Sequence, residues 1–164
     1  MAAKSTPASP PKQQLTLHKA TTEDIPILES MTSAAYTKYI SRIGKPPAPM
    51  TEDWVQTIRT NTVLVLRDID QTVGSITFHK EQDTNSLKIE NVVVDPTAQA
   101  RGYGSYMIKN VEAECRKQSL PCITLYTNVK MFENIGYYAK MGFVETGRRM
   151  EDGFERVYLC KEIL

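Results

Sequence analysis

The stretch that decides the fold is Asp95-Pro96-Thr97-Ala98-Gln99-Ala100-Arg101-Gly102-Tyr103-Gly104-Ser105. It follows the apolar run Val92-Val93-Val94 and precedes apolar residues at helical spacing, which predicts a strand, a loop and a helix in that order. Gly102 and Gly104 allow a close ligand approach or a positive φ. Free amides at a helix start attract an anion, and Arg101 adds a fixed charge. The segment therefore predicts a phosphate-binding loop.

A Gly-x-Gly pair alone is also compatible with an ordinary strand-to-helix turn. The run lacks the third glycine of a dinucleotide-binding fingerprint. It also lacks the Gly-Lys-Ser/Thr ending of an NTPase loop. These two nucleotide-binding classes are therefore disfavoured.

The surrounding sequence predicts a mixed order of strands and helices. Leu15 and Leu17 indicate a first short strand, and Thr22 reads as the cap of a helix ending near Tyr39. Prolines make 42–50 a stiff loop before a helix at 51–59 that Thr51 caps. The other predicted elements are strands at 62–67, 73–80, 87–94 and 121–127, helices from Gly104 and at 131–141, and a hairpin turning at Asp152-Gly153. Strands 87–94 and 121–127 should be parallel.

Length and composition predict one domain. The chain has 164 residues, 41% of them hydrophobic, and one domain of this size buries a sizeable core. Residues 1–14 contain no aromatic or branched aliphatic side chain, so we expect a disordered N-terminal tail. The folded domain is expected to span 15–164.

Charge and hydropathy disfavour several classes of partner. The formal net charge is +1, so no strong field exists to attract nucleic acid. No apolar run approaches the roughly 20 residues that span a bilayer, and no secretion signal opens the chain. We expect a soluble, cytoplasmic protein with no membrane or nucleic-acid partner.

The cysteines and histidines do not indicate a metal site. Cys115, Cys122 and Cys160 lack Cys-x-x-Cys spacing, and we interpret them as buried thiols. His18 and His79 are far apart in the sequence and are interpreted as structural or exposed.

Two segments together resemble the GNAT superfamily of acyl-CoA-dependent N-acetyltransferases. The run 99–104 resembles its Gln/Arg-x-x-Gly-x-Gly/Ala loop. Asn134-Ile135-Gly136-Tyr137-Tyr138-Ala139-Lys140-Met141-Gly142-Phe143 resembles its Asn-x-x-Phe/Tyr-Tyr-x-Lys-x-Gly-Phe segment. The loop at 39–50 also resembles a branch of small GNAT proteins, without settling the acceptor.

This resemblance implies an α/β (α+β) GNAT-like fold. Its central sheet would be mixed, mostly antiparallel and of about seven strands, with about four flanking helices and a splayed strand pair that binds CoA. It also implies acetyl-CoA as the acyl donor, with backbone amides on its pyrophosphate and no metal. The implied cofactor-binding residues are Val92, Val93, Val94, Gln99, Ala100, Arg101, Gly102, Tyr103, Gly104, Ser105, Asn134 and Tyr137.

The reaction implied by the resemblance needs a base. An acceptor ammonium with a pKa of about 10.4 is neutral in only about one molecule in several thousand near pH 7. By strand alternation Glu90 shares a face with Val92 and Val94, at the place where several GNAT enzymes carry a catalytic glutamate. The alternatives are that Glu90 only pairs across the sheet and a water chain serves as the base. Asn91, expected on the other face, is a weaker candidate.

A second catalytic candidate, Tyr138, resembles the family tyrosine that protonates the departing thiolate. It also falls on an apolar stripe with Ile135 and could be a core aromatic. A backbone amide near Val92 would stabilise the oxyanion in a direct transfer, which leaves Cys115 no role as a nucleophile.

The resemblance places the acceptor under the first two helices and their loop. The implied substrate-binding residues are Tyr36, Tyr39, Arg42, Met50 and Trp54. Tyr36 could equally be core, and Arg42 could only cap a helix end. We expect a small-molecule amine as acceptor, with a protein amine, or a CoA sensor without turnover, as alternatives. Many such proteins are homodimers, but nothing in the sequence indicates an interface.

Overall fold

The structure, a computed structural model, describes residues 14–164. The tail expected at 1–14 therefore lies outside the described residues, apart from Gln14 at its boundary.

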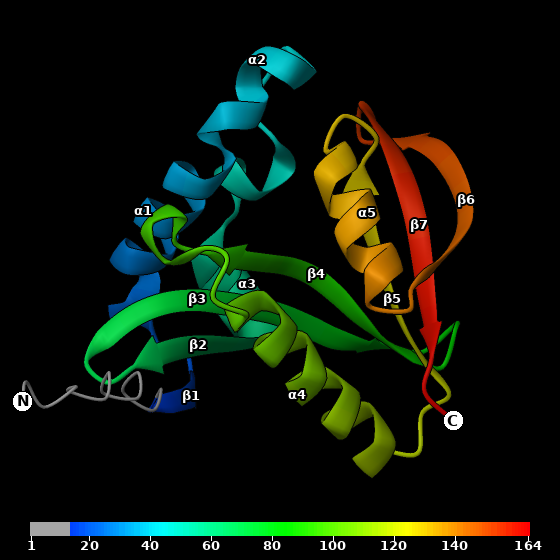
Figure 1. The fold of residues 1–164 in the computed structure, drawn as a ribbon, viewed down its shortest axis with the longest axis horizontal. Helices are drawn as coiled ribbons and strands as arrows, with labels where there is room; N and C mark the ends of the chain where they lie inside the picture. The colour runs from blue at the N-terminus through cyan, green and yellow to red at the C-terminus, as the bar shows by residue number, and fades with distance from the viewer. Residues whose placement is uncertain (1–13) are drawn as a thin grey trace, which may run out of the picture.

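A seven-stranded sheet forms the centre of the fold (Figure 1). Its strand order is β1-β2-β3-β4-β5-β7-β6, and every neighbouring pair is antiparallel except β4 and β5. The strands are β1 (Leu15–Lys19), β2 (Thr62–Asp68), β3 (Gln71–Glu81), β4 (Ser86–Val94), β5 (Cys122–Asn128), β6 (Val144–Glu151) and β7 (Phe154–Glu162). The predicted mixed, mostly antiparallel sheet is confirmed, as is its one parallel pair.

Helices cover both faces of this sheet. On one face α1 (Ile25–Tyr36) and α3 (Trp54–Thr60) pack on Val63, Val65 and Val93. On the other, α4 (Tyr103–Lys117) and α5 (Phe132–Lys140) share the larger core with alternate residues of the same strands. The thiol of Cys115 is buried in this core, as predicted, whereas Cys122 and Cys160 are only partly buried, contrary to the prediction.

Two helix starts differ from the predicted ones by one or two residues. Asp24 Oδ2 accepts from Thr21 N at 2.8 Å, so Thr21 rather than Thr22 opens the first helical segment. Asp53 rather than Thr51 caps α3, and its Oδ1 accepts from Gln56 N at 3.1 Å. At α3 the two polar residues Thr51 and Asp53 compete for the cap, and the backbone direction selects Asp53, whose side chain meets a free amide.

The proline-rich loop is more ordered than predicted. Its first residues complete α2 (Ile40–Ile43), which ends at Gly44 with φ of 89°. A 3₁₀ turn follows at Ala48–Thr51. Prolines fix φ near the value of a tight turn, so the segment folds back compactly.

A β-bulge in β4 changes which side chains share a face. Thr77 of β3 pairs with Asn91 and Phe78 pairs with Ile89, so Glu90 has no partner on β3. The extra residue shifts the alternation by one. Glu90 and Asn91 therefore lie on the face of Val93, and the prediction that Glu90 shares a face with Val92 and Val94 is wrong.

The bulge also marks the point where two strands separate. β4 pairs with β5 only from Ser86 to Ile89, while β4 continues to Val94 and β5 to Asn128 (Figure 1). Beyond Ile89 the β4 edge that faces β5 has no strand partner. The predicted splayed strand pair is therefore present. Val92 and Val94 are only partly buried there, contrary to the prediction that this strand is buried on both faces.

Candidate active site

A slot of about 390 Å³ lies between the free edge of β4, the start of α4 and α5. We call it the coenzyme slot. The residues predicted to bind the cofactor that line it are Val92, Val93, Val94, Gln99, Ala100, Gly102, Tyr103, Gly104, Ser105, Asn134 and Tyr137. Residues from three distant parts of the sequence therefore meet at one slot.

The loop at the start of α4 has the backbone geometry of an anion cradle. Gly102 precedes the helix with φ of 82°, and Ala100 has φ of 63°. Tyr106 N donates to Gly102 O at 3.0 Å, so the amides of the first turn have no acceptor within the helix. They face an anion at the positive end of the helix dipole. These residues fit a diphosphate.

The wall beside the loop is closely packed. A Cβ added to Gly104 would meet Tyr137 Oη at 3.1 Å. Ser105 Oγ and Tyr137 Oη are hydrogen-bonded at 2.8 Å. The absence of a side chain at Gly104 thus lets the Tyr137 hydroxyl of α5 pack against the start of α4.

Of the predicted loop residues, one lies outside the slot and another has its side chain turned into the core. Arg101 is exposed and does not line the slot. The side chain of Tyr103 is buried and donates a hydrogen bond to Asp68, so its backbone is what remains for a ligand.

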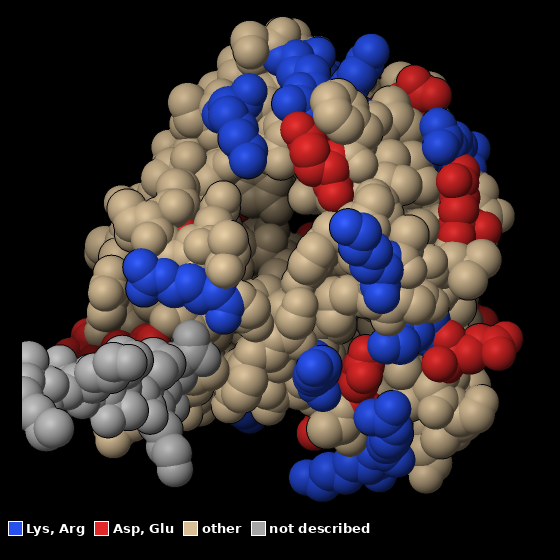
Figure 2. All heavy atoms as spheres, in the orientation of Figure 1, with Lys and Arg blue, Asp and Glu red and all other residues tan. Residues whose placement is uncertain are grey.

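The surface is hollowed on this face, between the α1–α2 side and α5 (Figure 2). Both basic and acidic side chains lie around the mouth of the hollow (Figure 2), and the slot lining includes one of each, Lys38 and Glu133.

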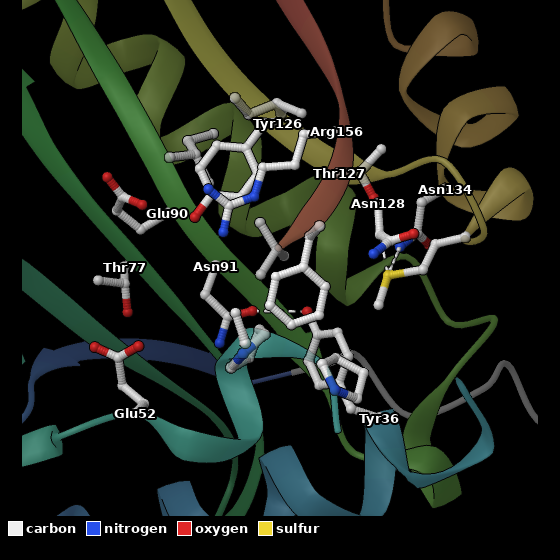
Figure 3. A pocket seen from close by; sticks show the side chains of 18 of the residues that line it. Tyr36, Glu52, Thr77, Glu90, Asn91, Tyr126, Thr127, Asn128, Asn134 and Arg156 are labelled. Carbon is white, nitrogen blue, oxygen red and sulfur yellow. Dashed lines mark hydrogen bonds between the residues drawn. The ribbon is translucent and has the colours of Figure 1, made fainter. Parts of the chain in front are cut away.

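A second cavity of about 350 Å³ opens on the side of the sheet that carries α3 (Figure 3). We call it the acceptor cavity. Tyr36, Val92, Asn134 and Tyr138 line both this cavity and the coenzyme slot. The two spaces therefore meet beside Val92 and Tyr138, where two bound molecules would come into contact.

Glu90 lines the acceptor cavity and has two basic neighbours. Its Oε1 lies 3.5 Å from His79 Nδ1 and 3.5 Å from Lys88 Nζ. The histidine contact is not a hydrogen bond, because His79 Nδ1 forms none with the described residues. His79 also lines the cavity, so its interpretation as a structural or exposed residue missed this position.

The polar floor of the acceptor cavity continues along β3 and β4 (Figure 3). Tyr36 Oη donates to Asn91 Oδ1 at 2.8 Å, which fixes the amide. Thr77 is 2% exposed, and its Oγ1 has no hydrogen-bond partner among residues 14–164. Since a buried hydroxyl without a partner is costly, Thr77 provides a site for a water or an acceptor group.

Tyr138 fits both interpretations of its motif, the core aromatic and the proton donor. Its ring packs edge-on against Tyr137 and Phe143, so it contributes to packing. It also lines both cavities, and Oη forms no hydrogen bond within the described part of the chain. Burial raises the pKa of Tyr138, which keeps the hydroxyl protonated and able to donate.

The predicted acceptor residues separate into three groups. Tyr36 and Trp54 line the acceptor cavity, whereas Tyr39 lines the coenzyme slot. Met50 lines neither space. Arg42 also lies outside both, so these two residues do not reach the predicted site.

Arg42 instead joins α2 to α5. Its Nη1 and Nη2 donate to the carboxylate of Glu133 at 2.7 and 2.9 Å, and Nη1 also donates to Lys130 O at 3.0 Å. The hydrogen bond from Arg42 lowers the pKa of Glu133 to about 2. The pair is exposed, so it holds two elements together rather than binding a ligand.

Sequence reasoning missed several cavity residues on the last strands. Tyr126, Asn128 and Arg156 project into the acceptor cavity from β5 and β7 (Figure 3). Arg156 and Asn128 are register partners, a pairing that no local pattern predicts. The only sequence signal was an arginine on a strand otherwise rich in apolar residues.

Two further properties concern the described residues alone. Within 14–164 no group of three or more His, Cys, Asp or Glu side chains is placed to hold a metal ion. In the same span, no helix has the length and apolar character needed to traverse a bilayer.

The sequence model of the "Acetyltransferase (GNAT) family" matches residues 28–143, which include the bulge, the anion cradle and all of α5. The chain belongs to the GNAT acetyltransferase family. It is also 28% identical over 96 residues to the uncharacterized protein YxbD of Bacillus subtilis (strain 168). That match covers 53% of this chain and 58% of YxbD, less than two thirds of that relative.

Solved structures show the same fold. The ribosomal-protein-S18-alanine N-acetyltransferase of Escherichia coli has a TM-score of 0.72 at 18% identity, covering 92% of this chain and 94% of that one. A GNAT family acetyltransferase from Elizabethkingia anophelis with acetyl-CoA bound has a TM-score of 0.69 at 18% identity, covering 92% and 99%. The predicted GNAT fold is confirmed, and acetyl-CoA as the family's donor agrees with the second structure.

Replacing Gly102 tests the anion cradle. Gly102→Val places a β-branched residue at φ of 82° and displaces the free amides, so we expect CoA affinity to fall at least about tenfold in calorimetry. Gly44→Val is the matched control, because Gly44 has φ of 89° and open space around it but lies at the end of α2, away from the cradle. An equal loss in both variants, or none in Gly102→Val, contradicts the cradle.

Proposed function

We propose that this chain transfers the acetyl group of acetyl-CoA to the primary amine of a small molecule, by direct attack with both substrates bound. The proposal rests chiefly on one observation, the meeting of the coenzyme slot with the acceptor cavity beside Val92 and Tyr138. A coenzyme in one space and an amine in the other would have their reacting atoms at this junction.

The roof of the acceptor cavity favours a small acceptor over a protein. Lys45 Nζ donates to Gly153 O at 2.8 Å and lies over the ring of Phe154, which ties the proline-rich loop to the β6–β7 turn. The Arg42–Glu133 pair ties α2 to α5 on another side. A polypeptide would need an open groove between these elements, whereas a small amine fits within about 350 Å³.

The side chains of the acceptor cavity supply the proton transfer at nitrogen. When bound, acetyl-CoA supplies an activated thioester. Glu90 accepts a proton from the acceptor ammonium, directly or through a water held near Thr77. The neutral nitrogen then forms the N–C bond as the C–S bond breaks, and the second proton that this nitrogen loses passes to solvent water. Base assistance of this kind contributes about 10²- to 10⁴-fold in rate.

The junction residues stabilise the other charges that develop. A backbone amide of β4 near Val92 donates to the carbonyl oxygen as it becomes negative. Tyr138 Oη donates a proton to the departing sulfur. Because a thiol has a pKa of about 8.5, this proton assists the reaction without controlling it. The cysteines take no part in this scheme.

Two other functions remain distinguishable by experiment. The Escherichia coli enzyme that shares this fold is a ribosomal-protein-S18-alanine N-acetyltransferase, whose acceptor is a protein. A coenzyme sensor would bind acetyl-CoA without turnover. We expect thiol release from acetyl-CoA with members of a broad small-amine library, and none with peptides that carry a free N-terminus. Release only with peptides favours the protein acceptor. Stabilisation by acetyl-CoA without any release favours the sensor.

Glu90→Gln tests the base. The variant keeps the shape of the side chain but cannot accept a proton, so we expect kcat/KM to fall by about 10²-fold or more and the acidic limb of the pH profile to flatten. Glu81→Gln is the matched control, since Glu81 contacts the same Lys88 at 3.8 Å but does not line the cavity. An unchanged acidic limb in Glu90→Gln would show that a water relay serves instead.

Tyr138→Phe tests the proton donor. Removing only the hydroxyl should lower kcat by about tenfold while CoA affinity changes little, because the ring packing remains. Tyr137→Phe should do the opposite, since Tyr137 Oη bonds Ser105 in the coenzyme slot. If Tyr138→Phe weakens coenzyme binding as much as it slows turnover, Tyr138 has a packing role only.

A further inference from the structure

Arg156 is a buried cation in the wall of the acceptor cavity (Figure 3). Its side chain is 6% exposed. It reaches the cavity from β7, opposite Asn128 of β5, away from the coenzyme slot. A guanidinium remains charged at all physiological pH values, and a buried charge needs partners to offset its desolvation.

Among residues 14–164, only one nitrogen of this guanidinium has hydrogen-bond acceptors. Nη1 donates to Glu151 Oε1 at 3.0 Å and to Asp152 Oδ2 at 3.4 Å. The guanidinium also stacks on Tyr126, with Cζ 4.2 Å from the ring centroid. All hydrogen bonds of Arg156 to the described residues leave from Nη1, so Nε and Nη2 have no acceptor there. Those two nitrogens form the edge that binds a carboxylate through two parallel hydrogen bonds.

The neighbouring groups leave that edge available. Glu151 shares its carboxylate with Arg149 at 3.3 Å and also accepts from Tyr158, so it does not serve Arg156 alone. Burial, with a further contribution from Glu90, raises the pKa of Tyr126 to about 12, so its hydroxyl remains neutral. Stacking and the Nη1 contacts hold the guanidinium in one orientation, which reduces the entropy lost when an anion binds.

We propose that the acceptor is an amino acid-like molecule whose carboxylate binds the Nε–Nη2 edge of Arg156 while its amine lies at the junction near Val92. This inference rests on the proposed function, because it names the substrate class of the same site. The cavity then has an acidic wall at Glu90 for the ammonium and a basic wall at Arg156 for the carboxylate. A polyamine would place a second cation against Arg156, and a simple monoamine would leave its free edge unpaired.

Binding of reaction products tests the carboxylate subsite without the complication of a titrating amine. We would titrate the full chain, saturated with CoA, with N-acetylglycine, N-acetyl-β-alanine and N-acetylphenylalanine, and with the primary carboxamide of each. We expect at least one acid to bind about tenfold or more tightly than its carboxamide, as charged hydrogen bonds allow. If no acid binds more tightly than its carboxamide, the proposal is overturned.

Variants assign that preference to Arg156. Arg156→Gln should abolish the difference between acid and carboxamide, and Arg156→Lys should retain only part of it, since an ammonium lacks the planar fork. Arg149→Gln is the matched control, because Arg149 pairs with the same Glu151 but lies outside the cavity. Unchanged CoA affinity would show that each variant is folded. The wild-type comparison of acid with carboxamide stands even if Arg156→Gln does not fold.

Measurements of turnover distinguish a failure of the carboxylate subsite from a failure of the proposed function. Thiol release is measured with glycine, β-alanine and phenylalanine and with their carboxamides. A carboxylate preference in binding, without release by any amine, overturns the proposed function and leaves the subsite in place. Release by amines and carboxamides, without any carboxylate preference in binding, overturns the subsite and leaves the proposed function in place.

Discussion

The loss of pairing between β4 and β5 beyond Ile89 is the constraint on which the rest of the structure depends. In a continuous sheet the backbone groups of this edge would bond the next strand, and no slot would exist. The extra residue at Glu90 turns β4 away from that pairing. The edge that results has hydrogen-bonding groups for an extended ligand, and leaving such groups unsatisfied costs about 1–3 kcal/mol each. The pantetheine arm of a coenzyme is extended and carries amide groups that can bond this edge.

The same bulge has a second consequence on the face of the sheet that α1 and α3 cover. It brings Glu90 and Asn91 to one side of β4, where Asn91 bonds Tyr36 and Glu90 meets His79 and Lys88. One irregularity therefore opens the coenzyme slot and builds the polar floor of the acceptor cavity. The two spaces meet because both begin at this point of the sheet.

Contacts between distant segments complete the cavity. Arg42 with Glu133, and Lys45 with the β6–β7 turn, join the first half of the chain to the last. Arg156 is placed by the register of β7 on β5. The exposed contacts of Arg42 and Lys45 contribute little to stability, but together with Arg156 they determine the size and charge of the space left for an acceptor.

Much of the fold followed from the sequence, because alternation, helical spacing and turn residues are local properties. The anion cradle was predictable for the same reason, since Gly102 and Gly104 act through their own backbone at a helix start. The two motifs, at 99–104 and 134–143, likewise indicated the family by resemblance. Local patterns failed at Glu90, because a bulge reverses alternation without a signature in residue type. They failed at Arg42 and Arg156 as well, because only tertiary packing decides that one guanidinium meets Glu133 outside the site while the other lines the cavity.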